Sequence, residues 1–367
     1  MLQGRGVVKP PTGITLDSDF GNGIDSILTL ALLRGMMAKG ETRLLSQSIS
    51  KANVKAAQAA DAISTFFNGP PVVVQGSPVG GNPEMIGLAT NGKMKEDTPV
   101  LNAVVPKYSS KVRGVIDTAE CSVTMRNILL AQNDLNAIVL VDGPATNAVE
   151  LMELYGAKPQ IVAKVVRLVI AAGAYPNGAA ETGIKSDIAA AKKLFAEWPT
   201  PIVVVGSEVG EAIPYPGSSI EKDFTWSTAH PVVDAYKAFK PMPYDAPAPG
   251  LAAALYAAHP DDGYFKLSEP GTITVQDDGR TKFTPAPGGK HRYLIADPAQ
   301  KDKITQLYTE LVSAKPVARQ PFGRGGRGGS GFGGRGGSGA LGIGGGRGGS
   351  GAGGRGAPPA VIPPPQQ

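Results

Sequence analysis

The sequence predicts an α/β protein with a mainly parallel central sheet flanked by helices. Apolar runs typical of strands alternate with longer segments of helical periodicity, which is the pattern of strands connected by helices. The chain has 367 residues, of which 42% are hydrophobic, so it can bury a large core. Much of its glycine and proline lies at the carboxyl end, outside this pattern. We therefore predict one domain over residues 1–318 and a disordered Gly/Arg-rich tail over residues 319–367.

The predicted strands are short apolar runs. They span residues 13–17, 43–49, 71–74, 137–141, 165–171 and 201–205. Five segments between them place apolar residues three and four positions apart, as amphipathic helices do. These segments span residues 25–38, 53–67, 121–132, 147–155 and 187–196. The alternation of strands and helices favours a parallel sheet.

After residue 206 the alternation ends, and proline-rich segments follow at residues 214–216 and 240–249. An alanine-rich helix is predicted over residues 249–258 and a closing helix over residues 298–313. Between them, residues 271–275 resemble a strand, and the sequence Asp277-Asp278-Gly279 is typical of a hairpin turn. We expect these elements to be additions around the central sheet.

The tail carries the positive charge of the chain. Residues 319–367 contain six arginines and no Asp, Glu or Lys, so the formal net charge of +5 leaves the body at about −1. The body therefore gives no electrostatic reason to expect nucleic-acid binding. The Arg-Gly-Gly repeats with Phe322 and Phe332 resemble the RGG segments of RNA-binding proteins. Two interpretations stay open: a flexible extension with weak affinity for polyanions, which we favour, and a dedicated RNA-binding segment.

Cysteine and histidine are too scarce for several classes of site. Cys121 stands alone, which excludes an internal disulfide, and with three histidines it cannot form a Cys/His zinc cluster of usual spacing. The sequence has no P-loop, no H-E-x-x-H and no G-x-S-x-G motif. We expect no membrane span, because no apolar run approaches the ~20 residues that a bilayer requires. The compartment stays open between the cytoplasm and secretion after loss of a leader.

The densest polar cluster follows the first predicted strand. Asp17 and Asp19 lie two residues apart, so their side chains point to one side if the strand extends that far. Parallel sheets place ligands at the carboxyl ends of their strands, and Asp25 stands at the start of the next helix. Three carboxylates on one loop repel one another, and oxygen ligands suit Ca²⁺ or Mg²⁺. The alternative is that Asp25 caps the helix while the other two make loop hydrogen bonds.

Several motifs resemble, in the same order, those of the inosine-uridine nucleoside hydrolases. Residues 17–26, DSDFGNGIDS, are similar to a longer form of the DTDxGxDD signature of that family. Residues 139–147, VLVDGPATN, resemble its strand followed by a G-P-L-T-N turn. Residues 169–175, Glu181 and residues 187–191 resemble its G-G…E-F-N…D-P-x-A-A stretch, and Tyr244-Asp245 stands where the family has a late His-Asp pair. The resemblance covers residues 12–312 and implies the nucleoside hydrolase fold and activity.

The resemblance implies a Ca²⁺ site. Three ligands of that family, two carboxylates and a threonine carbonyl, correspond here to Asp19, Asp245 and Thr146. The fourth ligand, a carboxylate, is replaced by Ser26, and Gly23 stands where the longer form often has another Asp. A site with fewer carboxylates binds calcium more weakly, unless Asp25 takes the place of the missing ligand.

The resemblance also implies a ribose site and a base site. The residues that correspond to ribose contacts are Asp25, Glu181 and Asn177, with Asn53 as a further candidate. Gly183 replaces the asparagine of E-F-N, which removes one sugar contact. Asp19 is the expected general base, and Tyr244 replaces the histidine that serves the leaving base in some relatives. Without the neighbouring motifs, Glu181 and Asn177 would be interpreted as an ordinary polar loop.

We therefore predict a Ca²⁺-dependent hydrolase that acts on a small-molecule nucleoside or related riboside. Cleavage of an N-glycosidic bond passes through an oxocarbenium-like sugar, which carboxylates stabilise, while a metal-bound water is acidified. The alternative is a non-catalytic relative that binds a sugar or nucleoside and whose metal site is weakened by Ser26 and Gly23. A third interpretation is an RNA-associated protein that binds RNA through its tail. The resemblance also implies a homo-oligomer, and it leaves the preferred nucleobase open.

Overall fold

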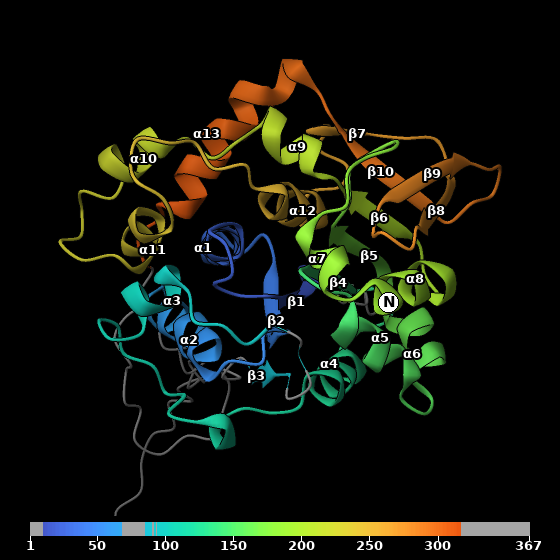
Figure 1. The fold of residues 1–367 in the computed structure, drawn as a ribbon, viewed down its shortest axis with the longest axis horizontal. Helices are drawn as coiled ribbons and strands as arrows, with labels where there is room; N and C mark the ends of the chain where they lie inside the picture. Colours follow the sequence, from blue (N-terminus) through green and yellow to red (C-terminus); the bar gives the residue numbers. More distant parts are fainter. Residues whose placement is uncertain (1–9, 68–84, 90–91, 93, 317–367) are drawn as a thin grey trace, which may run out of the picture. The chain divides into compact units, whose positions relative to one another are not determined.

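The computed structural model describes residues 10–67, 85–89, 92 and 94–316. Within them, ten strands form one sheet (Figure 1). They are β1 Gly13–Ser18, β2 Arg43–Ile49, β3 Met85–Leu88, β4 Ala137–Asp142, β5 Val165–Ala171, β6 Ile202–Val205, β7 Phe265–Leu267, β8 Gly271–Val275, β9 Thr281–Pro285 and β10 His291–Ala296. The predicted α/β class is confirmed, with β1, β2, β4, β5, β6 and β8 at the predicted positions. The strand predicted at residues 71–74 and the tail predicted from residue 319 lie outside the described residues.

The order of the strands shows where the chain changes direction across the sheet. Neighbouring strands follow the order β3-β2-β1-β4-β5-β6-β10-β8-β9. Neighbours from β3 to β10 are parallel, whereas β8 pairs antiparallel with β10 and β9, and β7 pairs antiparallel with β10. The chain places β1 to β3 in one direction and then β4 to β6 in the other. The switch point therefore lies between β1 and β4.

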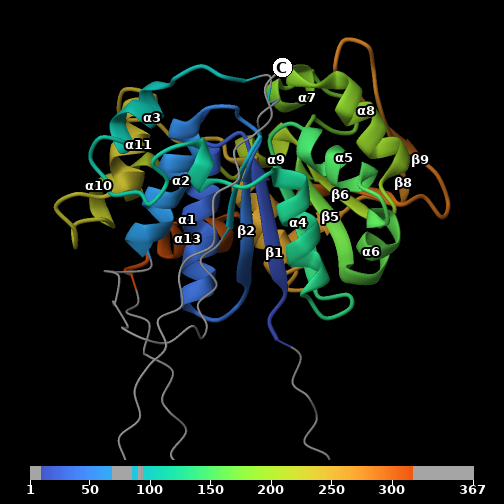
Figure 2. The same cartoon turned by 90° about the horizontal axis from the view of Figure 1, so that it is seen from below.

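Helices cover both faces of the sheet (Figure 2). One side carries α1 Asp25–Ala38, α2 Val54–Phe67, α3 Pro99–Val104, α11 Pro231–Phe239, α12 Pro249–Ala258 and α13 Lys301–Val312. The other side carries α4 Cys121–Leu130, α5 Thr146–Glu153, α6 Ala157–Lys164 and α8 Ile188–Glu197. Shorter helices lie in the connections: α7 Thr182–Ser186, α9 Ser207–Ala212, α10 Gly217–Lys222 and the 3-10 turns Val115–Asp117 and Pro298–Gln300. The predicted helices are confirmed, and residues 298–313 divide into a 3-10 turn and α13.

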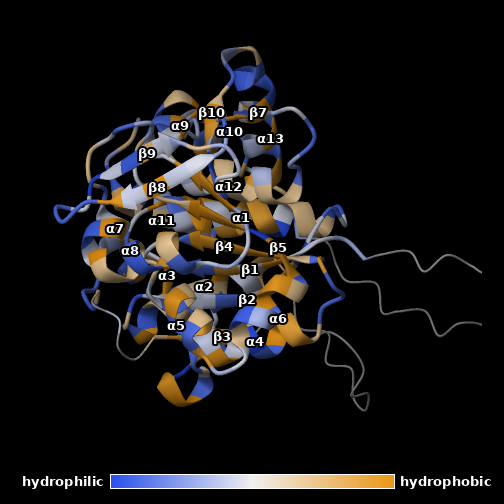
Figure 3. Cartoon of the chain, turned by 90° about the vertical axis from the view of Figure 1, so that its right-hand side faces the viewer, coloured by the Kyte–Doolittle hydropathy of each residue, from blue (hydrophilic) through white to orange (hydrophobic). Residues whose placement is uncertain are grey.

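The inner strands contribute to two apolar cores, one on each face. In β4, Ile138 and Leu140 belong to the core beside α1, whereas Val139 and Val141 belong to the core beside α5. Successive side chains of a strand point to opposite faces, so a strand covered on both faces is apolar throughout. Figure 3 shows the resulting hydrophobic colours along the inner strands.

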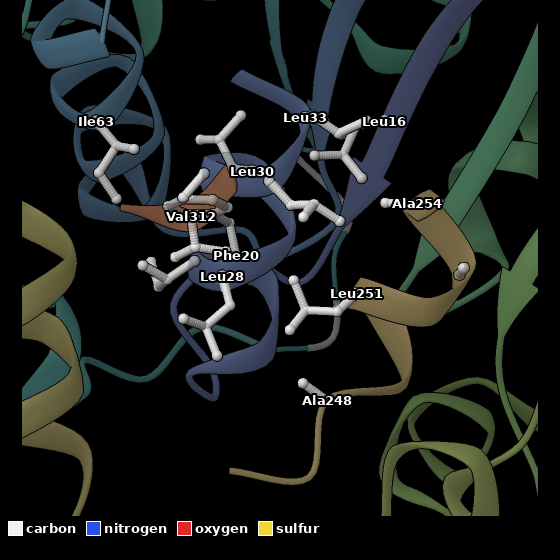
Figure 4. Close-up of a cluster of buried hydrophobic side chains, with 14 of the residues drawn as sticks. Leu16, Phe20, Leu28, Leu30, Leu33, Ile63, Ala248, Leu251, Ala254 and Val312 are labelled. Atoms are coloured by element: carbon white, nitrogen blue, oxygen red, sulfur yellow. The ribbon is translucent and has the colours of Figure 1, made fainter. Parts of the chain in front are cut away.

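Helix α1 is the most enclosed element on its side of the sheet. Every residue from 26 to 36 is buried, and the helix packs against α2, α12 and α13. Figure 4 shows its side chains in one cluster with Leu251 of α12 and Val312 of α13. The packing with α13 is so close that a Cβ on Gly35 would lie 2.3 Å from the carbonyl oxygen of Leu311. The core therefore fixes α1, and with it the loop that joins β1 to α1.

The region after residue 206 is more regular than the sequence predicts. Helices α9, α10 and α11 form there, and α11 begins at Pro231. Proline is well suited to this position, because the first residue of a helix donates no hydrogen bond within the helix. Strand β10 extends the parallel sheet beside β6, although its residues alternate poorly between apolar and polar. No helix among the described residues is long and apolar enough to cross a membrane.

Candidate active site

Carboxylates gather at the switch point of the sheet. Asp17 lies in β1, Asp19 follows that strand, and Asp142 ends β4. Because β1 and β4 are parallel neighbours, with Ser18 opposite Asp142, their carboxyl ends meet. The amide of Asp19 donates a hydrogen bond to the carbonyl of Asp142 (3.3 Å). We name the acidic cluster by its five members: Asp17, Asp19, Asp25, Asp142 and Glu181.

Asp17 is enclosed by the protein. Its Oδ1 accepts a hydrogen bond from Nδ2 of Asn147 in α5 (2.7 Å), while Oδ2 has no hydrogen-bond partner among the described residues. Burial raises the pKa of Asp17 to about 8, Asn147 opposes this shift, and the charges of Glu150 and Asp19 add to it. Asp17 is therefore held to α5 through Asn147, and burial favours its protonated form.

Asp19 is accompanied by polar and cationic groups. Its Oδ2 accepts a hydrogen bond from Nδ2 of Asn22 (3.1 Å), and Oδ1 of Asn22 accepts one from Nζ of Lys51 (3.3 Å). Burial raises the pKa of Asp19 to about 6, and both Asn22 and Lys51 oppose the shift. Asp19 is consequently ionised near pH 7 yet still able to accept a proton.

Two loops approach each other closely beside Asp19. A Cβ on Gly143 would lie 2.7 Å from the amide nitrogen of Asp19, closer than real side chains come. Glycine at this position therefore lets the β4–α5 loop lie against the β1–α1 loop.

Asp25 begins α1 and reaches α12. Its Oδ2 accepts a hydrogen bond from the amide of Gly250 (2.9 Å), and its Oδ1 accepts one from the hydroxyl of Thr29 (3.4 Å). Burial raises the pKa of Asp25 to about 7, and repulsion from Asp19 adds to the shift. In the part of the chain that the structure describes, the start of α1 has no side-chain cap, so the alternative of Asp25 as a helix cap is wrong.

Asp142 is a site residue that sequence reasoning missed. Its side chain is buried (8% exposed), and its Oδ2 finds no hydrogen-bond partner within the described ranges. Burial together with the charges of Asp25 and Asp19 raises its pKa well above the usual range, against a hydrogen bond from Thr29. The signal that points to Asp142 is its place directly after the predicted strand 137–141, since ligands gather at the carboxyl ends of parallel strands.

Glu181 joins the cluster from α7. Its carboxylate accepts hydrogen bonds from the amides of Gly183 (2.8 Å) and Ile184 (2.7 Å), so it caps the helix. Burial still raises the pKa of Glu181, and its charge raises the pKa of Asp19 and of Asp142. Glu181 therefore both holds its own loop and contributes negative charge to the site.

Lys51 is a buried cation beside Asp19. Its side chain is fully buried, and desolvation lowers its pKa against the opposing charge of Asp19. A buried ammonium group beside a carboxylate offsets part of the negative charge of the site. Sequence reasoning missed Lys51, although it lies two residues after β2, at the same edge of the sheet.

Ser26 and Thr146 lie at the starts of the two helices that follow the switch point. Oγ of Ser26 accepts a hydrogen bond from the amide of Gly21 (3.1 Å). The hydroxyl of Thr146 donates to Oδ2 of Asp187 (2.8 Å). Thr146 and Glu150 also line a cavity of about 400 Å³, which no member of the acidic cluster lines. The two predicted ligands are thus near the edge of the sheet, with their hydroxyl groups engaged in loop contacts.

Tyr244 and Asp245 make their contacts at α10 and α11. Asp245 is exposed, and its Oδ1 accepts a hydrogen bond from the amide of Gly217 (2.8 Å). The hydroxyl of Tyr244 donates to the carbonyl of Tyr236 (2.6 Å), and the two rings stack with centroids 4.4 Å apart. The structure does not bring this pair to the acidic cluster.

Asn53 and Asn177 likewise form hydrogen bonds elsewhere. Nδ2 of Asn53 donates to Oδ1 of Asp97 (2.8 Å) and to the carbonyl of Lys95 (2.9 Å). Asn177 is exposed and forms a short antiparallel bridge with Lys282 of β9. Of the predicted ribose contacts, the structure brings together Asp25 and Glu181.

The donor set of the acidic cluster fits a hard cation. Its donors are oxygens, its carboxylates repel one another, and Asp142 keeps a buried oxygen that no described residue pairs. Across the described ranges, no group of three or more His, Cys, Asp or Glu side chains is arranged to hold a metal ion. A cation here would therefore combine two carboxylates with hydroxyl, carbonyl or water oxygens, which Ca²⁺ accepts.

The strand order and the cluster define an α/β protein with carboxylates at the switch point of its sheet, which is where sheets of this kind bind ligands. Comparison of the sequence with family models gives no match, and comparison with curated proteins gives none either. Solved structures do match. The inosine-uridine preferring nucleoside hydrolase from Bacillus anthracis has a TM-score of 0.60 and 17% identity over 82% of this chain and 99% of its own.

Two further solved structures agree with this match. A plant nucleoside hydrolase has a TM-score of 0.61 and 18% identity over 83% of this chain and 100% of its own. The purine-preferring ribonucleoside hydrolase from Gardnerella vaginalis has a TM-score of 0.62 and 16% identity over 82% of this chain and 98% of its own. This protein has the nucleoside hydrolase fold, and the fold implied by the sequence resemblance is confirmed.

Proposed function

We propose that this protein hydrolyses the N-glycosidic bond of a ribonucleoside or a related riboside. The observation that supports this most strongly is the acidic cluster at the switch point between β1 and β4. Doubly wound sheets bind small ligands in this crevice, and buried carboxylates stabilise the positive charge that develops on a sugar as its glycosidic bond breaks. The three solved structures compared above are named nucleoside hydrolases, which supports the same activity.

The environments of the carboxylates support different roles for them. Asp19 accepts the proton of the attacking water, because its pKa of about 6 leaves it ionised near neutral pH. Asp25 and Glu181 accept hydrogen bonds from the ribose hydroxyls and face the developing positive charge. Asp17 holds a proton and, through Asn147, fixes the β4–α5 loop.

A calcium ion is part of the proposal. When bound, a divalent cation lowers the pKa of a water molecule and so supplies a nucleophile near neutral pH. The resemblance assigns as ligands Asp19, Ser26, Thr146 and Asp245, and the acidic cluster offers Asp25 and Asp142 as further donors.

The leaving group is expected to need little protonation. Tyr244, the proposed counterpart of a family histidine, uses its hydroxyl within the contact to Tyr236. His230 and His291 accept hydrogen bonds from the amides of Val232 and Ile273. Ribosides with good leaving groups are therefore the substrates on which turnover is expected to be fastest.

Hydrolysis of inosine, uridine and p-nitrophenyl riboside by the purified protein, with added Ca²⁺ or with EDTA, tests the proposal. We expect turnover that Asp19→Asn reduces by about 10²–10⁴-fold, the range for loss of a general base. Asp277→Asn is the matched control, since Asp277 is fully exposed, and it is expected to keep full activity. A folded protein that cleaves none of the three ribosides would favour the alternative, a non-catalytic binder of a sugar or nucleoside.

The tail gives a second, weaker proposal. Its six arginines and lack of acidic residues favour a loose contact with polyanions. Removal of residues 319–367 is expected to weaken retention on heparin and to leave riboside hydrolysis unchanged. Loss of hydrolysis on this truncation would contradict a separate role for the tail. Association of copies, which the resemblance implies, is checked by light scattering on the same samples.

A further inference from the structure

We propose that Asp142 is the carboxylate that, together with Asp25, forms the divalent cation site of this protein, and that Asp245 takes no part in it. The inference deepens the proposed function, on which it rests for the presence of a cation. It assigns a ligand from the end of β4 in place of one from the loop before α12.

The first turn of α12 brings Asp25 and Asp142 together. The amide of Gly250 donates to Oδ2 of Asp25 (2.9 Å), and a Cβ on Gly250 would lie 2.6 Å from Oδ2 of Asp142. The same Cβ would lie 2.4 Å from the hydroxyl oxygen of Thr29, which donates to Oδ1 of Asp25 (3.4 Å). Both carboxylates therefore lie against one glycine and one hydroxyl group, and there is no space for a side chain at position 250.

One carboxylate oxygen of Asp142 is buried without a hydrogen bond to any described residue. The residue is more than nine-tenths buried, and its Oδ2 has no hydrogen-bond partner in the part of the chain that is described. Burying a carboxylate without full pairing is costly, and two carboxylates at one position repel each other besides. A bound cation removes both costs, and Ca²⁺ accepts the carboxylate, hydroxyl and water oxygens available here.

Lys51 compensates a different member of the cluster. Its Nζ donates to Asn22, which in turn donates to Asp19, and its charge lowers the pKa of Asp19. The positive charge of this lysine therefore compensates Asp19. The negative charge of Asp25 and Asp142 is left for a bound cation to compensate.

Asp245 is already used elsewhere. Its carboxylate accepts a hydrogen bond from the amide of Gly217 at the start of α10, and the side chain is exposed. No hydrogen bond or ion pair among the described residues joins Asp245 to a member of the acidic cluster. If Asp142 takes the ligand role that the resemblance assigns to Asp245, the site keeps a carboxylate. Asp245 then serves to hold the loop before α12 against the start of α10.

Calorimetric titration with Ca²⁺ and melting temperatures with Ca²⁺ or EDTA test the assignment on three full-length proteins: the wild type, Asp142→Asn and Asp245→Asn. We expect Ca²⁺ to bind and to raise the melting temperature of the wild type and of Asp245→Asn alike. Asp142→Asn should bind Ca²⁺ at least about 100-fold more weakly, because loss of an outer-shell partner alone can cost this much. In EDTA, Asp142→Asn should melt at or above the wild-type temperature, since a buried like charge is removed.

Three results would overturn the assignment: Ca²⁺ affinity kept in Asp142→Asn, affinity lost in Asp245→Asn, or no binding of Ca²⁺ to the wild type. Riboside hydrolysis measured on the same samples separates this inference from the proposed function. Turnover that is independent of cations would overturn the cation site and leave the hydrolase proposal standing. Cation binding that depends on Asp142, without any turnover, would support the site and contradict the hydrolase.

Discussion

Two regions of this protein bury titratable side chains, and they do so with opposite results. The acidic cluster buries carboxylates that face one another, so that burial raises the pKa of Asp19 to about 6 and that of Asp25 to about 7. The second region, here the aromatic cluster, surrounds His230 with four aromatic rings, those of Phe66, Phe67, Phe224 and Trp226. Burial lowers the pKa of His230 to about 3, which leaves the imidazole neutral.

The opposite directions of these pKa shifts indicate a different role for each region. Neutral His230 caps α11 by accepting the amide hydrogen of Val232 at Nδ1 (3.2 Å), while its buried Nε2 has no hydrogen-bond partner among the described residues. Its role is therefore one of packing and capping without a charge. The acidic cluster keeps like charges together, which lowers stability and is typical of a ligand site. Substitutions in the two regions should therefore change different quantities.

Among the variants that compare the two regions, the largest effect is expected from Gly143→Ala beside the acidic cluster. The new Cβ would lie 2.7 Å from the backbone nitrogen of Asp19, so one loop must move. A shift of about 1 Å at a catalytic group costs about 10²-fold in rate, and we expect that loss in kcat for riboside hydrolysis. Gly23→Ala is the matched control, because no described atom lies within 4 Å of its Cβ position. Equal activity of the two variants would show that the approach of the loops is unimportant.

In the aromatic cluster, His230→Ala should reduce stability and spare activity. It removes a buried ring and a helix cap, which together cost about 2–4 kcal/mol in the free energy of unfolding. His230→Asn keeps a capping oxygen and should recover about 1 kcal/mol of that loss. Urea denaturation measures both values. A loss of kcat at full folding would contradict the division of roles between the regions.

The two regions should also give opposite dependences of stability on pH when divalent cations are removed. Asp25 has a pKa of about 7 in the folded state against 3.8, so its contribution is present below pH 3.8 and is lost as pH rises through 7. His230 has a folded pKa of about 3 against 6.5, so its contribution is present above pH 6.5 and is lost as pH falls toward 3. The two windows overlap between pH 3.8 and 6.5, so the two slopes oppose each other in the wild type, and unfolding free energies measured in EDTA from pH 4 to pH 9 must be compared between variants to separate them.

Matched variants assign those slopes to their groups. Of the two slopes, Asp25→Asn should keep the rise in stability with pH up to 6.5, which His230 causes, and His230→Asn should keep the fall with pH up to 7, which Asp25 causes. A stability that falls between pH 4 and pH 7 in Asp25→Asn as steeply as in His230→Asn would show that Asp25 is not the group that titrates there.

The smallest expected effect compares two hydroxyl groups. Thr29→Val removes a donor to Asp25, while Ser219→Ala removes the partner of the Tyr215 hydroxyl (2.8 Å), far from any carboxylate cluster. Each loss should cost about 1 kcal/mol, with Thr29→Val somewhat costlier at pH 8.5, where Asp25 is ionised. At pH 5, where Asp25 is protonated, the two costs should converge. A difference that persists at pH 5 would contradict the charged state of Asp25 as its cause.

Most of the central sheet could be predicted from the sequence because its inner strands are mainly short apolar runs. Strand β5 agrees with the predicted bounds, residues 165–171, because both of its faces are covered and six of its seven residues are apolar. Strand β2 also agrees with its predicted bounds, residues 43–49, although four of its seven residues are polar or charged. Strand β10 could not be predicted in this way, because its partners β6, β7 and β8 come from three different parts of the chain. Helices α9 to α11 could not be predicted either, because the proline-rich segments that flank them resemble loops.

The site was predictable where it follows directly from a strand. Asp17 lies near the end of β1, Asp19 in the loop that follows and Asp25 at the start of α1, so their proximity is local. Tyr244 and Asp245 could not be placed, because their orientation depends on contacts with α10 and α11.

The sequence by itself determined the alternation of strands and helices and the acidic loop after β1, because hydrophobic periodicity and short-range spacing are local properties. The tertiary structure decided which carboxylates meet. Asp142 and Gly250 are 108 positions apart in the chain numbering, and they adjoin because β4 lies beside β1 while α12 packs on α1. Contacts of that range depend on the packing of the whole core, which no local pattern encodes.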